Sequence, residues 1–138
     1  MYVIKFTDDG LEDVRRLPKN VRNALKAEMR SKLAVNPTGC GEALQNVLNG
    51  WYSYHYRGYR VVYKVFEDLR AVGVVGIGKH DPSLAKDIYR RLEASARQGK
   101  LAESVLVALR GFSEGYEGRK RPVRRASSAD TPAEAWQD

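Results

Sequence analysis

The chain has 138 residues, of which 43% are hydrophobic and 30% charged, a composition that fits one globular domain with a short appendage and excludes two full domains. No apolar run approaches the roughly 20 residues of a membrane span, and the first residues lack a signal-peptide pattern, so we expect a cytoplasmic protein with no membrane partner. With one cysteine and two histidines, we expect no internal disulfide, no metal site and no cofactor.

Positive charge is concentrated in the first 100 residues. This part holds 18 Lys or Arg against 11 Asp or Glu, whereas residues 101–138 hold six of each kind. Such an excess suits a polyanionic partner, such as RNA, DNA or an acidic protein. A soluble basic domain without such a partner would have the same composition, so charge alone leaves both interpretations open.

The N-terminal part predicts one strand and two helices. Residues 2–6 are rich in β-branched and aromatic types and predict a strand. Residues 8–17 predict a short helix, with acidic side chains at its start and arginines near its end. Residues 19–35 predict an amphipathic helix with a basic outer face, which the sequence Asn36-Pro37 ends. The two helices therefore form a hairpin after the first strand.

From the middle of the chain the pattern changes to short strands. Residues 51–56 alternate Trp, Ser and His on one face with three tyrosines on the other, and Arg57-Gly58 is a natural turn into a second strand over 59–66. Residues 71–79 are apolar on both faces, as is typical of an interior strand. The three strands predict an antiparallel meander.

The main domain is expected to cover residues 1–98 and to end with a helix. Asp81 and Pro82 are a suitable N-cap and first helical residue for it. An additional helix is predicted over residues 99–112. Residues 113–138 are polar and charged, so we expect disorder there. Their basic run RKRPVRR suits either an RNA-binding arm or a solubilising end.

This order of elements, together with three short segments, resembles the RelE/ParE family of toxins from toxin-antitoxin pairs. The segments are GYRVVYKV (58–65), VVGIGKHD (74–81) and KDIYRRL (86–92). The resemblance implies an α+β fold in which an antiparallel sheet, made of the N-terminal strand and the meander, packs against the helical hairpin and a C-terminal helix. It also implies a cognate antitoxin protein as partner.

The resemblance leaves more than one activity open. RelE-like members resemble ribosome-dependent mRNA endonucleases, whereas ParE-like members lack the nuclease residues and poison DNA gyrase. We favour a metal-independent nuclease that cuts mRNA on the ribosome, with gyrase inhibition by binding as the alternative. A third interpretation is an inactive member that pairs with an antitoxin or binds its operator.

Metal-independent RNA cleavage needs a group that accepts the 2′-hydroxyl proton, positive charge at the phosphate and a proton for the leaving 5′-oxygen. Arg60, in the GYR motif, matches the family's strand arginine, which implies phosphate stabilisation; it could also simply hydrogen-bond across the sheet. An imidazole can give or take a proton near neutral pH, so His80 is the candidate acid or base, unless it only caps the next helix. Lys79 would add electrostatic support.

Two further residues are candidates for the chemistry. Tyr89, in KDIY, matches the family's C-terminal tyrosine, which implies base stacking or proton relay, although helix tyrosines commonly serve packing. RelE-like members carry lysines where this chain has Tyr52 or Tyr54, which argues against a strict RelE mechanism. His55 is a candidate replacement for proton transfer, on the strand face opposite the tyrosines.

Several other basic residues are candidates for contacts with phosphates, and each would add modest, salt-dependent affinity. They are Arg57, Lys64, Arg22, Lys26 and Arg30. Charged faces of helices are commonly only solvated, so this assignment competes with a purely structural one.

Overall fold

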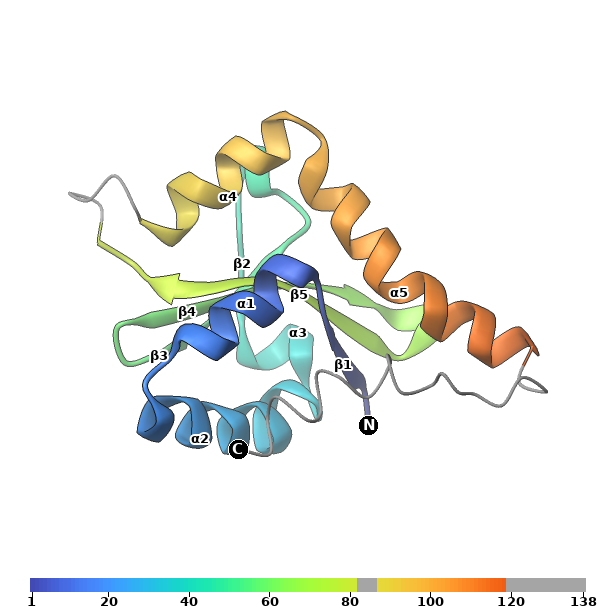
Figure 1. The fold of residues 1–138 in the computed structure, drawn as a ribbon, viewed down its shortest axis with the longest axis horizontal. Coiled ribbons are helices and arrows are strands. Elements are labelled where there is room, and N and C mark those ends of the chain that lie inside the picture. The colour runs from blue at the N-terminus through green and yellow to red at the C-terminus, as the bar shows by residue number, and fades with distance from the viewer. Residues whose placement is uncertain (82–86, 119–138) are drawn as a thin grey trace.

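A computed structural model describes residues 1–81 and 87–118, and it confirms the α+β class. Five strands form one sheet in the order β1-β5-β4-β3-β2 (Figure 1). The strands are β1 (Val3–Phe6), β2 (Glu42–Ala43), β3 (Tyr52–Tyr56), β4 (Tyr59–Phe66) and β5 (Ala71–Lys79). The antiparallel meander of β3, β4 and β5 is confirmed, and β2 adds a short antiparallel edge.

The N-terminal strand differs from the predicted antiparallel arrangement. β1 pairs with β5 in parallel, with Val3 opposite Ala71 and Phe6 opposite Val74. The reason is the connection: the chain passes through the helical hairpin and three strands before it returns as β5, and so long a crossover allows parallel pairing. The sheet is therefore mostly antiparallel, with one parallel pair at its edge.

Helices cover both faces of the sheet. They are α1 (Asp8–Arg16), α2 (Lys19–Glu28), α3 (Pro37–Cys40), α4 (Ile88–Arg97) and α5 (Lys100–Gly118), with a π-helical turn η1 (Met29–Leu33) and 3-10 turns η2 (Asn46–Leu48) and η3 (Glu67–Leu69). The predicted hairpin is confirmed: Thr7 caps α1 by accepting the Gly10 amide at 3.0 Å. The second predicted helix is α2 continued by η1.

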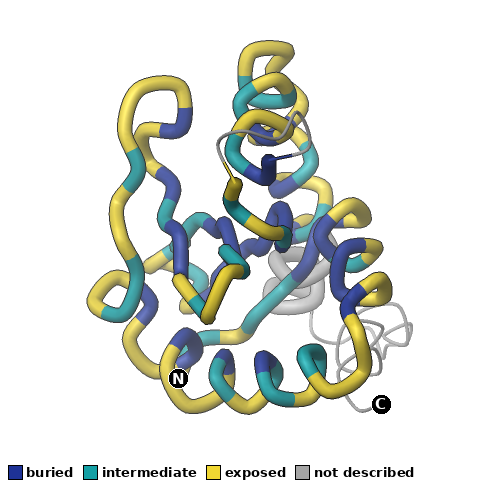
Figure 2. Tube along the Cα trace, turned by 90° about the vertical axis from the view of Figure 1, so that its left-hand side faces the viewer, coloured by how far each residue is buried: buried dark blue, intermediate teal, exposed yellow. Residues whose placement is uncertain are grey.

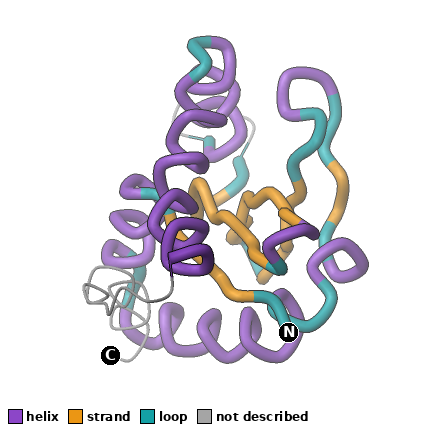
Figure 3. Tube along the Cα trace, turned by 90° about the vertical axis from the view of Figure 1, so that its right-hand side faces the viewer, coloured by secondary structure: helices purple, strands orange, loops and turns teal. Residues whose placement is uncertain are grey.

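The sheet separates two apolar cores. The hairpin helices α1 and α2 pack on one face with the β3 tyrosines, and α4 and α5 pack on the other with Trp51 (Figure 1). The predicted alternation along β3 is thereby confirmed. Figure 3 shows the strands enclosed between helices, and Figure 2 shows exposed residues on the outer sides of those helices.

The C-terminal helices differ from the prediction in their bounds. The N-cap of α4 is Asp87 rather than Asp81, because the Asp87 carboxylate accepts backbone amides of the first turn. Pro82 lies outside the described residues. Helix α5 continues to Gly118 instead of ending at residue 112, so residues 113–118 are helical where disorder was expected, since a single glycine weakens a helix without breaking it. The run RKRPVRR also lies outside the described residues.

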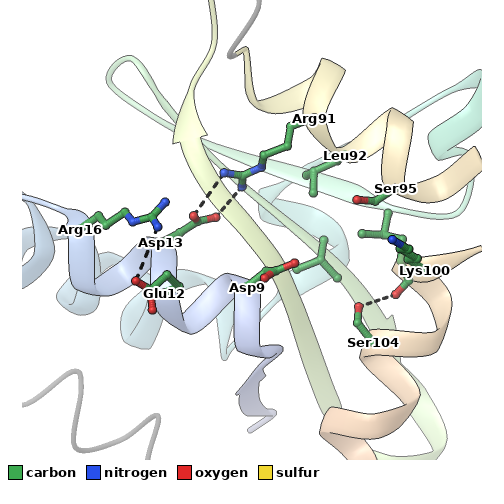
Figure 4. Close-up of a pocket in the computed structure, with 11 residues that line it drawn as sticks. Asp9, Glu12, Asp13, Arg16, Arg91, Leu92, Ser95, Lys100 and Ser104 are labelled. Atoms are coloured by element: carbon green, nitrogen blue, oxygen red, sulfur yellow. Dashed lines mark hydrogen bonds and ion pairs between the residues drawn. The ribbon is translucent and has the colours of Figure 1, made fainter. Parts of the chain in front are cut away.

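One buried carboxylate joins three elements. β1 pairs with β5 only as far as Val74, and beyond it Asp13 of α1 accepts the Ile77 amide of β5 at 2.9 Å. Arg91 of α4 donates Nη2 to Asp13 Oδ2 at 2.5 Å and Nη1 to Oδ1 at 3.3 Å (Figure 4). Gly10 lets α1 approach this edge, since a Cβ there would lie 2.6 Å from the Val74 carbonyl oxygen. Asp13 therefore sets where α1 and α4 lie relative to β5.

The Asp13–Arg91 pair borders a cavity of about 310 Å³ between α1, α4 and α5 (Figure 4). Acidic and basic side chains both line it, among them Asp9, Arg16 and Lys100. Within the described part of the chain, no helix is both long and apolar enough to cross a membrane.

Replacing Asp13 with Ala should lower the free energy of unfolding by about 2–3 kcal/mol, because the Ile77 amide and Arg91 both lose their acceptor. Arg91 is 43% exposed and can regain water, which keeps the loss below the roughly 3–5 kcal/mol typical of a fully buried pair. Urea denaturation followed by circular dichroism measures it. The matched control is Glu12→Ala, whose pair with Arg16 is exposed and whose loss should stay below about 0.5 kcal/mol. Equal losses in the two variants would contradict the role given to Asp13.

Candidate functional site

Three of the predicted site residues lie on the same sheet face, the one covered by α4. His55 of β3 is the direct cross-strand partner of Arg60 of β4, and Arg60 is the partner of Gly78 of β5. Directly paired residues point to the same face. Gly78 lies beneath α4, since a Cβ on it would lie 3.4 Å from Ile88. His80, two residues beyond Gly78, points to this face as well.

His80 is held from two directions. Its Nδ1 lies 2.6 Å from Oδ1 of Asp87, and its ring meets the Tyr89 ring edge-on, with centroids 4.7 Å apart and planes at 72°. The Tyr89 hydroxyl in turn lies 2.7 Å from Oγ of Ser53, a buried residue of β3. The His80 side chain remains 31% exposed, so the ring is both fixed and accessible.

Asp87 is the buried anchor of this arrangement, with a side chain 2% exposed. Burial would raise the pKa of its carboxyl group, but the hydrogen bonds from His80 and from the amides of Asp81 and Arg90 outweigh burial and hold the pKa below its usual value. Asp87 is therefore ionised at neutral pH and accepts hydrogen bonds without donating any.

His55 differs from His80 in its surroundings. Its Nε2 lies 3.1 Å from Oε1 of Glu42 on the edge strand β2, and its side chain is 45% exposed. Burial lowers the pKa of His55, and the positive charge of Arg60 lowers it further, against the opposing effect of Glu42. His55 is therefore neutral at pH 7, as a proton acceptor must be.

Arg60 is bound to its own hairpin turn. Nη1 donates to the carbonyl oxygens of Arg57 at 3.1 Å and Tyr59 at 3.0 Å. Arg57 has a backbone φ of 56°, which is uncommon for residues other than glycine, so these hydrogen bonds stabilise the turn. The Nε atom of Arg60 is buried and has no hydrogen-bond partner in the described structure.

The remaining basic residues do not join this cluster. Lys79 points to the opposite face, where its Nζ lies 5.6 Å from the centre of the Tyr59 ring. Lys64 lies over Trp51, four residues along β4 from Arg60 and thus about 13 Å away. Arg57 covers the Tyr56 ring at 5.0 Å.

The three basic residues predicted on the second helix lie across the sheet from α4. Arg22 and Lys26 belong to α2 and Arg30 to η1, and these elements pack on the face opposite α4. The basic residues predicted to contact phosphates are thus spread over both faces of the sheet and do not form one surface.

Three residues of the cluster were not predicted from the sequence. Asp87 directly precedes a helical apolar pattern, Ile88 and Leu92, and is a cap signal that Asp81-Pro82 obscured. Ser53 shares its strand face with His55, but nothing in the pattern indicates a hydrogen bond to a distant tyrosine. Glu42 belongs to a two-residue strand, which is too short to give a periodic signal.

Known proteins similar to this chain come from toxin-antitoxin systems. The family model of the ParE toxin of type II toxin-antitoxin systems matches residues 4–84. Toxin RelE of Mycobacterium tuberculosis strain H37Rv is 29% identical over 82 residues, which cover 59% of this chain and 84% of that protein.

Two solved structures share the fold. The RelBE2 toxin-antitoxin complex of M. tuberculosis matches with a TM-score of 0.55 and 23% identity, over 57% of this chain and 91% of that one. The isolated RelE toxin of E. coli matches with a TM-score of 0.52 and 27% identity, over 70% of this chain and 98% of that one. The family match ends at residue 84, so Asp87 and Tyr89 lie beyond it.

The pKa of His55 should respond to its two charged neighbours in opposite directions. In an NMR titration, wild-type His55 should titrate below about 6.5. Arg60→Gln should raise this pKa because it removes a repelling positive charge, and Glu42→Gln should lower it because it removes an attracting negative charge. Arg70→Gln, at the far end of β5, is the control and should change nothing. An unchanged His55 pKa in Arg60→Gln would contradict the described cluster.

Proposed function

This chain belongs to the ParE toxin family of type II toxin-antitoxin systems, within the RelE/ParE superfamily, and we propose that it is a metal-independent endoribonuclease that cuts mRNA on the ribosome. The observation that carries the proposal is the convergence of Arg60, His55 and His80 on one sheet face. Permanent positive charge and titratable imidazoles are the two requirements of metal-independent RNA cleavage. We place the activity in the cytoplasm, where translating ribosomes are found.

The proposed reaction uses the nucleophile of the RNA itself. A 2′-hydroxyl loses its proton to an imidazole, its oxygen forms a bond to the adjacent phosphorus, and the bond from phosphorus to the 5′-oxygen breaks. The 5′-oxygen takes up a proton, so the products are a 2′,3′-cyclic phosphate and a 5′-hydroxyl. Arg60 balances the negative charge that develops on the phosphate, because a guanidinium is permanently charged.

Two predicted roles change in this proposal. Tyr89 contacts His80 through its ring and Ser53 through its hydroxyl, which supports a role in orienting His80 instead of stacking on a base. Lys79 lies on the other face, so it contributes at most a long-range field.

We propose an antitoxin protein as the partner of this chain. The matched structure from M. tuberculosis is a toxin-antitoxin complex, and another similar structure is an E. coli RelE mutant with a peptide of its antitoxin RelB (TM-score 0.51, 27% identity). Neutralisation by a bound protein would allow a cell to carry a toxin of either activity.

Inhibition of DNA gyrase by binding is the second candidate function. The matching family model is that of the ParE toxin. Moreover, RelE-like members have lysines where this chain has Tyr52 or Tyr54, and here Tyr54 is buried in the hairpin-side core and hydrogen-bonds to Glu28. The bonds from Arg60 to its own turn also suit a structural role.

Cleavage of mRNA on translating ribosomes, mapped by the new 5′ ends, tests the proposal. Arg60→Ala and His80→Ala should each reduce the cleavage rate by about 10²- to 10⁴-fold, because each removes charge stabilisation or proton transfer. Both should also relieve growth arrest on expression. Arg16→Ala, an exposed arginine of α1, is the control and should cleave like the wild type.

A supercoiling assay with purified gyrase separates the alternative. A wild-type chain that inhibits gyrase and leaves ribosome-bound mRNA intact would overturn the nuclease proposal. Equal toxicity of Arg60→Ala, His80→Ala and the wild type would do the same.

A further inference from the structure

Asp87 divides its carboxylate between two tasks. Oδ2 accepts the amides of Tyr89 at 3.0 Å and Arg90 at 3.3 Å, which is the capping of α4. Oδ1 accepts the amide of Asp81 at 2.7 Å and faces Nδ1 of His80 at 2.6 Å. Capping requires only the first oxygen. The second oxygen is therefore available to hold the histidine.

The contact with Asp87 decides which nitrogen of His80 carries the proton. An ionised carboxylate can only accept hydrogen bonds, so Nδ1 must donate. In the neutral ring, Nε2 then has the free lone pair. Among the described residues, the Tyr89 ring, His55 and Arg60 lie on the same side of the sheet as His80, and compared with these three groups Asp87 is the one that hydrogen-bonds to the ring.

The ring is also fixed in a second direction. The hydrogen bond at Nδ1 alone would still let the His80 ring rotate about the line from Nδ1 to Oδ1 of Asp87. The edge-on contact with the Tyr89 ring opposes that rotation. Tyr89 cannot easily move away because its hydroxyl is held by the fully buried Ser53. Ser53 lies on β3, so the orientation of the ring is set by the sheet as well as by α4.

We infer that Asp87 is a positioning residue for RNA cleavage: it holds His80 in the tautomer with the proton on Nδ1 and presents Nε2 as the base for the 2′-hydroxyl. This inference rests on the proposed function and deepens it, because it assigns the base to one atom. The proton moves from the 2′-oxygen to Nε2, the oxygen bonds to phosphorus, and the bond to the 5′-oxygen breaks. The 5′-oxygen takes a proton from water, and the imidazolium, stabilised by Asp87, returns its proton to solvent.

Asp87→Asn is the decisive variant. The asparagine oxygen can still accept the Tyr89 and Arg90 amides and keep the cap, but its NH₂ group would then face Nδ1 of His80 and also the Asp81 amide, which loses its acceptor. The ring must then accept at Nδ1 and carry its proton on Nε2, where it can no longer act as base. We expect the cleavage rate of ribosome-bound mRNA to fall by about 10²- to 10⁴-fold at unchanged KM, as for the wrong tautomer in other Asp-His pairs.

Nitrogen-15 NMR of the His80 ring gives a readout that is independent of activity. The wild type should show the Nδ1–H tautomer and Asp87→Asn the Nε2–H tautomer. Glu93→Gln, which removes one negative charge from the same helix, is the matched control and should change neither the tautomer nor the rate. If Asp87→Asn does not fold, Asp87→Ser keeps a good capping residue and should still lose the Nδ1–H tautomer.

Two outcomes would overturn the inference in different ways. An Asp87→Asn chain that cleaves mRNA within about twofold of the wild type, or that keeps the Nδ1–H tautomer, would overturn the role of Asp87 and leave the proposed function standing. A wild type that shows the Nδ1–H tautomer but cuts no RNA would overturn the proposed function, and the catalytic role of Asp87 with it.

Discussion

The arrangement of the site depends on the Asp13 carboxylate, which satisfies an open edge of the sheet and holds α4 at the same time. β1 ends opposite Val74, so on that side of β5 the Ile77 amide has no strand partner, and Asp13 accepts its hydrogen bond instead. The charge that this places in the interior is balanced by Arg91, one turn after the start of α4. Because Arg91 and Tyr89 share that helix, a bond made for the sheet edge also determines where the ring beside His80 lies.

The close approach of α4 to the sheet requires glycines in β5. A Cβ on Gly76 would lie 2.9 Å from Nη2 of Arg91 and 3.2 Å from Leu92. Glycine normally weakens a strand interior, and here the loss is offset because the helix can approach the backbone. The segment VVGIGKHD thus has a packing reason for its glycines: they let α4 lie close enough for Tyr89 to reach Ser53 across the sheet.

Features of the fold that depend on short-range periodicity, such as strands and the faces to which their residues point, could be predicted from the sequence. Strand alternation identified the meander and the opposite faces of His55 and Tyr54. The same alternation explains why Lys79 does not join His80, because neighbouring residues along a strand point to opposite faces. What could not be predicted depends on contacts between distant segments. The parallel pairing of β1 and the hydrogen bond between Ser53 and Tyr89 join residues 68 and 36 positions apart, and neither leaves a local pattern.

On the sheet face beneath α4 and α5, the apolar contacts that stabilise the fold and the polar groups of the candidate site lie at different positions along the strands. Val105 of α5 is buried against Gly73 of β5, and Leu92 of α4 is buried against Gly76 further along the same strand. Polar groups occur where α4 begins, at the end next to the β3–β4 turn, where the His80 amide bonds to the Gly58 carbonyl. There the His80 imidazole stays partly exposed while its partner Asp87 is buried. A reactive ring must reach its substrate, but the group that orients it acts best when water is excluded, and the start of a helix packed on a sheet supplies both conditions.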